Sequence, residues 1–162
     1  MKIKVKYHDP SMPRLKVIEK GDWIDLYATK LIIDEKERKP VEWEINGEKQ
    51  KGWFIGGGEY VKFGLGVSIE LPQGHEAWIV ARSSTFGRYG LQQTNPPAVI
   101  DNSYCGDDDI WHFLAYATRG TFVPLYARLC QFRIIKNMEK IEFIEVERLL
   151  NENRGGIGQT GI

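Results

Sequence analysis

The sequence predicts an all-β protein, folded as a sandwich or a barrel. Short segments of alternating apolar and polar residues recur along the chain and are rich in β-branched and aromatic side chains. Proline and glycine separate these segments at intervals of about 8–12 residues, which is typical of sandwiches and barrels. A length of 162 residues favours a single domain with a real core.

Each expected element follows from period-two patterning between turn residues. The expected strands are 1–7, 61–63, 67–71, 75–81, 110–116, 127–135 and 141–146. Only 146–151 has helical character, over one or two turns at most. We therefore expect a β domain over residues 1–150 and a flexible tail over 151–162.

A β-hairpin is expected over about 41–54. Asn46 and Gly47 form the pair that most favours a type I′ turn. Charged residues on one face, with Trp43, Ile45 and Trp53 on the other, suggest that the hairpin lies on the main body. We interpret it as a structural addition without chemistry.

Charge and composition exclude several classes of function. Twenty-two basic and 22 acidic residues cancel, so no overall positive field would hold a nucleic acid, and a bound anion must meet a local cluster. No apolar run has membrane-spanning length, and the N-terminus lacks the apolar stretch of a signal peptide. The spacing of histidine and cysteine suits no zinc site, and Cys105 and Cys130 are expected as buried free thiols. These features predict a cytoplasmic protein that binds neither membrane nor nucleic acid.

Arg82, Ser83 and Ser84 follow the expected strand 75–81. A guanidinium group supplies charge for a phosphate and the hydroxyls supply orientation, so these residues form a candidate phosphate site. The alternative is a polar turn with a serine that caps a helix.

Asp101 follows the apolar pair Val99–Ile100, with Tyr104 three residues further on. A carboxylate held against apolar neighbours keeps a basic oxygen that suits the activation of water. The backbone of Val99 and Ile100 could pair with the edge of a base, and Tyr104 could pack on a sugar. The alternative is an ordinary Asp-Asn-Ser turn.

Three further features carry polar groups. Asp25 lies between apolar neighbours and is either a hydrogen-bond anchor or part of the water shell of a metal. Arg128 and Gln131 have an odd separation, which places them on opposite faces of a strand unless a bulge intervenes. The segment 153–162 combines Arg154 and Thr160 with four glycines, a composition that suits a strap over a polyanion.

Taken in order, these segments resemble the five motifs of the trimeric dUTPase family, the deoxyuridine triphosphate nucleotidohydrolases. Residues 21–26 resemble the first motif, 82–84 the second, 99–106 the third, 128–131 the fourth and 154–161 the fifth. The resemblance implies a jelly-roll-like dUTPase β-fold. It also implies a homotrimer with shared active sites, in which the C-terminal tail of each subunit closes over a neighbour's site.

The activity implied by the resemblance is hydrolysis of dUTP to dUMP and pyrophosphate with Mg²⁺, which limits uracil incorporation into DNA and supplies dUMP. Asp101 would be the general base. No direct protein ligand is expected for Mg²⁺, which would be held by the triphosphate and by waters near Asp25 and Gln131. The substrate-binding residues would be Arg82, Ser83, Ser84, Asn95, Val99, Ile100, Tyr104, Arg128, Gln131, Arg154, Gly155, Gly156, Gln159 and Thr160.

The sequence departs from the family pattern at four places. Ile157 replaces the usual aromatic residue that stacks on uracil, and Gln159 replaces a serine. Ala98 replaces a glycine, and 126–127 replaces Gly-Asp. Because Trp111 and Phe113 are expected to face the core, His112 is a candidate for base stacking beside Ile157 in the usual position; the alternative for His112 is an exposed strand histidine without a role.

Two alternatives remain. A dCTP deaminase shares the fold and the trimer, but it is expected to carry a different third motif and a catalytic glutamate. A non-catalytic relative that binds a nucleotide or a protein is expected to lose the base or the tail arginine. Asp101 and Arg154 are both present here.

Overall fold

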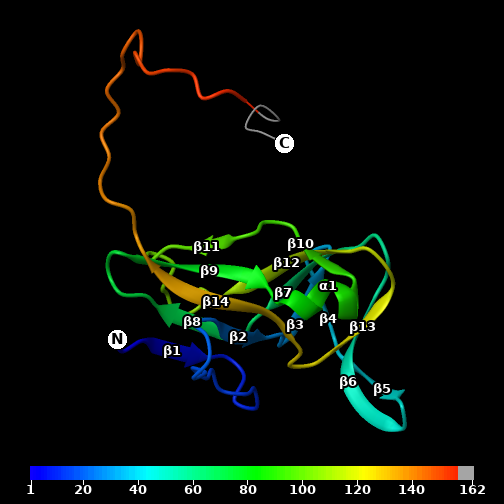
Figure 1. Cartoon of the computed structure of the whole chain (residues 1–162). Helices are drawn as coiled ribbons and strands as arrows, with labels where there is room; N and C mark the ends of the chain where they lie inside the picture. The colour runs from blue at the N-terminus through cyan, green and yellow to red at the C-terminus, as the bar shows by residue number, and fades with distance from the viewer. Residues whose placement is uncertain (157–162) are drawn as a thin grey trace.

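The computed structural model describes residues 1–156 (Figure 1). Within this range the chain forms strands, which are all paired antiparallel, and one short helix. In chain order they are β1 (Lys4–Tyr7), β2 (Ile24–Tyr27), β3 (Lys30–Ile33), β4 (Lys36–Arg38), β5 (Val41–Ile45), β6 (Glu48–Ile55), β7 (Tyr60–Gly64), β8 (Val67–Glu70), β9 (His75–Ala81), α1 (Ser83–Tyr89), β10 (Leu91–Gln93), β11 (Ala98–Ile100), β12 (His112–Ala117), β13 (Thr121–Pro124) and β14 (Arg128–Lys136).

Two sheets form the body. One has the strand order β10-β12-β7-β3-β4 and the other β11-β9-β14-β2, while β1-β8 and β13-β6-β5 form smaller sheets at the sides. The core includes Phe113 of β12, Trp111 immediately before β12, and Phe132 of β14 in the second sheet. The rings of Trp111 and Phe132 meet edge to face at 5.1 Å. The predicted all-β fold is therefore confirmed, and six of the seven expected strands are present.

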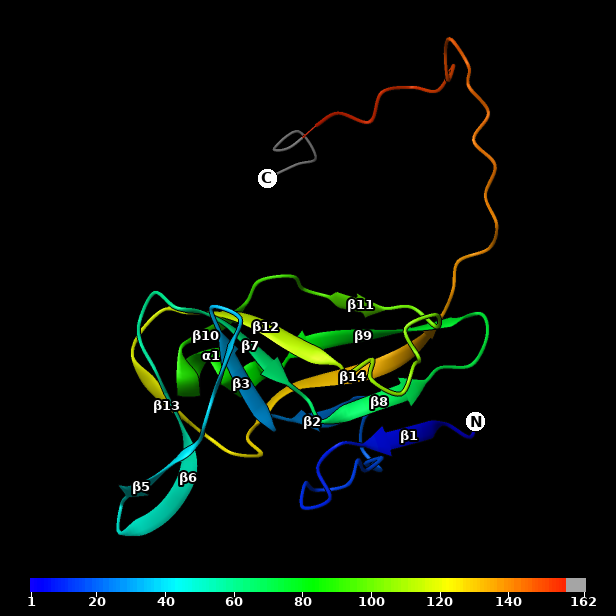
Figure 2. The same cartoon turned by 180° about the vertical axis from the view of Figure 1, so that it is seen from behind.

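The end of the chain differs from the expectation. No strand forms over 141–146 and no helix over 146–151; after β14 the chain runs outward from the body (Figures 1 and 2). Phe143 is 90% exposed and Leu149 and Leu150 are also exposed. The alternation of apolar and polar residues over 141–146 is present, but a strand forms only when it pairs with another strand. A helix of one or two turns at 146–151 is not stable without tertiary packing.

Among residues 1–156, the single helix α1 lies outside the segment for which a helix was expected. Helix α1 begins after Arg82 and ends at Gly90, whose left-handed φ of 64° lets its N–H donate to Phe86 O at 2.7 Å. Its Thr85 is fully buried and the Thr85 hydroxyl donates to Leu129 O at 2.6 Å. The segment 87–90 is thus helix and cap, and this tertiary bond to β14 anchors it.

The hairpin turn was predicted correctly, but the placement of the hairpin was not. Asn46 and Gly47 have φ of 52° and 80°, and β5 pairs with β6 across them. Trp43 is 51% exposed, whereas Trp53 is 2% exposed and donates from Nε1 to Arg38 O at 2.8 Å. The register pairs Trp43 with Gln50, so Trp53 lies on the opposite face. The tip of the hairpin projects from the body (Figure 2).

Among residues 1–156, no helix is long and apolar enough to cross a membrane. Both cysteines are free thiols, as expected, but Cys105 is exposed and only Cys130 is buried. Cys105 lies in the irregular segment between β11 and β12, where it is exposed to solvent.

Candidate functional site

Asp25 on β2 is the centre of a charged cluster. Arg82 Nε lies 2.8 Å from Asp25 Oδ1, and Arg128 Nη1 lies 3.0 Å from Asp25 Oδ2. Each carboxylate oxygen therefore meets one guanidinium group, Oδ1 in an ion pair with Arg82 and Oδ2 through a hydrogen bond from Arg128. Of the two alternatives for Asp25, the structure supports the hydrogen-bond anchor, and the side chain retains 24% exposure. Two cations fixed side by side on one carboxylate can meet a multiply charged anion.

A β-bulge places Arg128 and Gln131 on the same face of β14. Arg128 pairs with Tyr27 and Cys130 with the next residue of β2, Leu26, so Leu129 is the extra residue. Leu129 and Cys130 are both buried, and Gln131 then pairs with Asp25. A bulge changes which residues of a strand share a face, so Arg128 and Gln131 share one although their separation is odd.

The Leu129 carbonyl also positions the second arginine. It accepts the Arg82 N–H at 3.0 Å and the Thr85 hydroxyl at 2.6 Å. Ser83 and Ser84 are exposed in the first turn of α1, where amide groups have no intrahelical acceptor. Arg82, Ser83, Ser84, Arg128 and Gln131 therefore lie around one location, while their binding of a phosphate stays a prediction.

Gln93 is a supporting residue that sequence reasoning missed. Its buried side-chain amide accepts the Ala81 N–H at 2.7 Å and donates to Ile79 O at 3.0 Å. The amide thus satisfies backbone groups of β9 where β11 has ended. It holds the end of β9 from which Arg82 emerges. A glutamine in a short alternating segment carries no sequence signal for this role.

Asp101 lies in an exposed turn, where an apolar environment was expected. Asp101 Oδ1 accepts a hydrogen bond from the Ser103 hydroxyl and another from the Ser103 N–H at 3.0 Å. These bonds lower the pKa of Asp101 below its ordinary value of 3.8, with the hydroxyl as the largest cause. The expectation of a carboxylate made basic by apolar neighbours is wrong for this chain, because Asp101 is exposed and the hydrogen bonds from Ser103 dominate.

The groups predicted to contact a nucleoside lie around this turn. β11 is an edge strand, so the backbone of Val99 and Ile100 has one side without a strand partner. The Tyr104 hydroxyl donates to Ile110 O at 3.2 Å, and Asn95 is exposed before β11. The edge of β11 therefore offers main-chain donors and acceptors beside Tyr104.

His112 faces away from the core, as predicted from alternation, since Trp111 and Phe113 are fully buried. It lines a cavity of about 380 Å³ together with His8, Lys30 and Ile110. Burial, with Lys62 and Lys30 as further causes, lowers the pKa of His112 below its ordinary 6.5, so the ring is neutral at neutral pH. Ile110 connects this cavity to Tyr104. Base stacking by His112 stays a prediction.

One chain does not bring the two groups of residues together. Ile100 pairs with Ala77, so Asp101 lies level with Glu76, whereas Arg82 follows the opposite end of β9. The six residue steps from Glu76 to Arg82 span about 20 Å of extended strand. The tail leaves β14 at the Asp101 end, where Lys136 pairs with His75.

The tail motif is described only in part. Arg154, Gly155 and Gly156 are exposed. Ile157, Gln159 and Thr160 lie outside the described residues. The fifth motif therefore remains a prediction for this chain.

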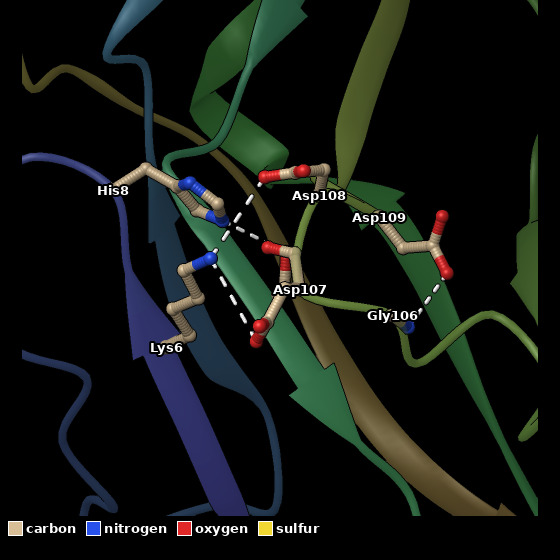
Figure 3. Close-up of polar contacts among 7 residues, drawn as sticks. Lys6, His8, Gly106, Asp107, Asp108 and Asp109 are labelled. Carbon is tan, nitrogen blue, oxygen red and sulfur yellow. Dashed lines mark hydrogen bonds and ion pairs between the residues drawn. The ribbon is translucent and has the colours of Figure 1, made fainter.

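An acidic turn follows Tyr104 (Figure 3). Lys6 Nζ lies 3.7 Å from Asp107 and 3.8 Å from Asp108, and Asp109 accepts the Gly106 N–H at 2.7 Å. Asp107 and Asp108 are almost fully exposed. In the part of the chain that the structure describes, no group of three His, Cys, Asp or Glu residues is placed to hold a metal ion. The turn is solvated.

Comparisons with known proteins decide the family. No protein-family model matches the sequence. The chain is 44% identical over 161 residues to the SPbeta prophage-derived deoxyuridine 5'-triphosphate nucleotidohydrolase YosS of Bacillus subtilis, covering 99% of each chain. This chain belongs to the dUTPase family.

Other dUTPases agree with this assignment. The deoxyuridine 5'-triphosphate nucleotidohydrolase of Hydrogenobaculum is 32% identical over 106 residues, covering 64% of this chain and 72% of that protein. The dUTPase of Staphylococcus bacteriophage 80alpha, solved with dUPNHPP, has a TM-score of 0.69 at 13% identity and covers 99% of both chains. The EIAV dUTPase has a TM-score of 0.59 at 13% identity, over 90% of this chain and 98% of that one. These structures show that the fold is the jelly-roll-like dUTPase β-fold.

Proposed function

We propose that the protein hydrolyses dUTP to dUMP and pyrophosphate, at sites that neighbouring copies complete within a homotrimer. The observation that carries this proposal is the separation of Asp101 from the Asp25–Arg82–Arg128 cluster by about 20 Å along β9. Both groups match motifs of the family, and one nucleotide cannot reach both on one chain. A second copy that presents its Asp101 turn to the arginine cluster would assemble a whole site.

The arginine cluster is the proposed phosphate side of the site. Arg82 and Arg128 neutralise charge on the triphosphate, and Ser83 and Ser84 orient its oxygens. Asp25 keeps both guanidinium groups in place through its two oxygens. No covalent nucleophile is needed, because positioning and charge neutralisation carry this class of reaction.

The Asp101 turn is the proposed nucleoside side. Val99 and Ile100 offer backbone bonds to uracil from the free edge of β11, Asn95 adds a further polar contact, and Tyr104 packs under the deoxyribose. Asp101 takes the proton of the water that attacks the α-phosphorus, and the bond to the bridging oxygen breaks as pyrophosphate leaves. The tail residues that would close over the site are Arg154, Gly155, Gly156, Gln159 and Thr160, with Ile157 or His112 covering the base.

Mg²⁺ fits this arrangement. Bound to the triphosphate, it would supply charge neutralisation at the phosphate oxygens. Both oxygens of Asp25 already pair with arginines, so Asp25 would not ligate Mg²⁺ directly, and waters of the Mg²⁺ shell would lie near Asp25 and the facing Gln131. Mg²⁺ keeps several waters and contacts few protein groups, which agrees with such an outer role.

We also place this activity in the cytoplasm, where it would limit uracil incorporation into DNA and supply dUMP. Two free thiols, one of them exposed, suit a reducing compartment.

The reaction is tested by pyrophosphate release from dUTP, dCTP, dTTP and UTP with Mg²⁺, together with an assay for ammonia. Release from dUTP alone is expected. Ammonia from dCTP would support the deaminase alternative, and tight nucleotide binding without turnover would support a non-catalytic relative.

The shared site is tested by mixing two inactive variants, Arg82→Ala and Asp101→Asn, after reversible dissociation. If each site takes its arginine cluster from one copy and its Asp101 from another, random trimers regain about a quarter of the wild-type activity. Mixtures that stay inactive would contradict sharing. Sedimentation of the wild-type protein measures whether three copies assemble.

A further inference from the structure

The turn that leads into the arginine cluster has an unusual backbone. Ala127 N–H donates to Pro124 O at 3.0 Å, which closes a tight turn over 124–127. Within it Tyr126 has a φ of 63°, in the left-handed region. A side chain with a Cβ disfavours this region, and glycine is the residue that adopts it freely. Some contact must therefore hold Tyr126 there.

The Tyr126 hydroxyl makes that contact. It donates to Asp9 Oδ2 at 2.7 Å, across 117 positions of sequence. Asp9 is itself fixed, because its Oδ1 accepts the Ser11 N–H at 2.8 Å. Burial and the bond to Asp9 raise the pKa of Tyr126 to about 12, so the phenol remains a donor at every physiological pH.

The same turn is bound to the strand that carries Asp25. Tyr126 N–H donates to Ala28 O at 2.7 Å, and Ala28 N–H donates to Ala127 O at 3.0 Å. Arg128 comes next, immediately before the bulge at Leu129, and its guanidinium reaches Asp25. The direction in which the chain leaves Tyr126 therefore decides which face receives Arg128.

We propose that the hydrogen bond between Tyr126 and Asp9 is a positioning device that holds the left-handed turn and thereby sets Arg128 on the substrate-binding face. The inference rests on the proposed phosphate-binding role of Arg128. Tyr126 does not contact the reacting atoms in this proposal. The hydrogen bond from its phenol stabilises a backbone conformation that glycine would adopt freely.

Three variants test the proposal. Tyr126→Phe removes the tether and keeps the unfavourable backbone, so the KM for dUTP should rise about tenfold with a smaller change in kcat. Tyr126→Gly removes the need for a tether and should restore a KM near that of the wild type. Asp9→Ala should raise KM in the wild-type background and have no further effect in either Tyr126 variant.

Tyr7→Phe is the matched control. It removes another phenol bound to the same N-terminal loop, since Leu15 N–H donates to Tyr7 Oη at 3.1 Å. Its KM should stay at the wild-type value. A Tyr126→Gly protein as impaired as Tyr126→Phe, or a Tyr126→Phe protein like the wild type, would overturn the proposal.

Amide hydrogen exchange gives a readout without activity. Exchange at Ala127 should speed up about tenfold in Tyr126→Phe and return towards the wild-type rate in Tyr126→Gly. If wild-type protein released no pyrophosphate from dUTP, the proposed function would fail while this measurement still decided the role of the tether. Unchanged exchange in Tyr126→Phe would overturn the positioning role by itself.

Discussion

Arg128 and Gln131 share one face of β14 although their separation is odd. Leu129, the extra residue of a β-bulge, shifts the alternation by one position. Gln131 therefore pairs with Asp25, and the Arg128 guanidinium donates a hydrogen bond to the Asp25 carboxylate. The Leu129 carbonyl that the bulge leaves accessible accepts from Arg82 and Thr85. One irregular residue thus helps to bring three motifs of the sequence, those of Asp25, Arg82 and Arg128, into a single charged cluster.

Asp25→Asn should weaken this cluster. The amide retains the shape, but it loses the charge that holds Arg82 and Arg128 together. Charge-assisted hydrogen bonds contribute about 1.5–3 kcal/mol, so kcat/KM for dUTP should fall about 10–100-fold. Steady-state kinetics measures this. Asp22→Asn is the control, because Asp22 is largely exposed and its contact with Arg133 is long, at 3.8 Å. Equal effects of both changes would contradict the role of Asp25.

Asp101→Asn should nearly abolish turnover while nucleotide still binds. The amide keeps the turn but cannot accept the proton of water, and loss of a general base costs about 10²–10⁴-fold in rate. Single-turnover kinetics and calorimetric titration with dUMP separate the two effects. Asp107→Asn, in the exposed neighbouring turn, should be neutral. Turnover near the wild-type rate would remove Asp101 from this role.

Ser103→Ala should move the acid limb of the pH profile. Because the Ser103 hydroxyl is the largest cause that lowers the pKa of Asp101, its loss raises that pKa towards 3.8. The carboxylate is the active form above its pKa, so kcat/KM should begin to fall at a higher pH than in the wild type. Brief assays between pH 3 and 6 (approximate limits set by the ordinary range for Asp) test this, with circular dichroism at each pH. If kcat/KM falls at the same pH in Ser103→Ala as in the wild type, protonation of Asp101 does not cause the loss of activity at acid pH.

Removal of 153–162 should leave the assembled protein folded. Residues 153–156 are exposed, so the melting temperature should not change, but turnover should fall sharply if the tail completes the site and excludes water. Differential scanning calorimetry and dUTP hydrolysis are the measurements. A shortened protein that unfolds would show a structural tail, and one that keeps full turnover would end the idea of closure.

His112→Ala should raise KM or lower turnover if this ring covers uracil. Base–aromatic stacking contributes about 1–3 kcal/mol, which is roughly one to two orders of magnitude in kcat/KM. His75→Ala is the control, because His75 bonds locally to Gln73 O. Unchanged kinetics in His112→Ala would leave Ile157 as the candidate cover for the base.

Local patterns in the sequence were sufficient for the all-β class, for six of the strands and for the Asn46–Gly47 turn, because alternation and turn chemistry act within a few residues. The order of the motifs was sufficient to identify the family, because each motif is a short run of residues that can be recognised without the fold. The failures were at positions where a distant partner decides the outcome. Residues 141–146 have the composition of a strand but pair with no sheet edge, and α1 depends on a bond from Thr85 to β14.

The sequence by itself determined which residues carry charge, hydroxyl groups and backbone freedom. Tertiary structure alone decided which of them meet: a bulge joins Arg128 to Asp25, and the register of β9 keeps Asp101 away from both. It also placed Asp9 against Tyr126, 117 positions apart. The physical reason is that strand pairing transmits position over the whole sheet, so one register or one extra residue moves every side chain that follows.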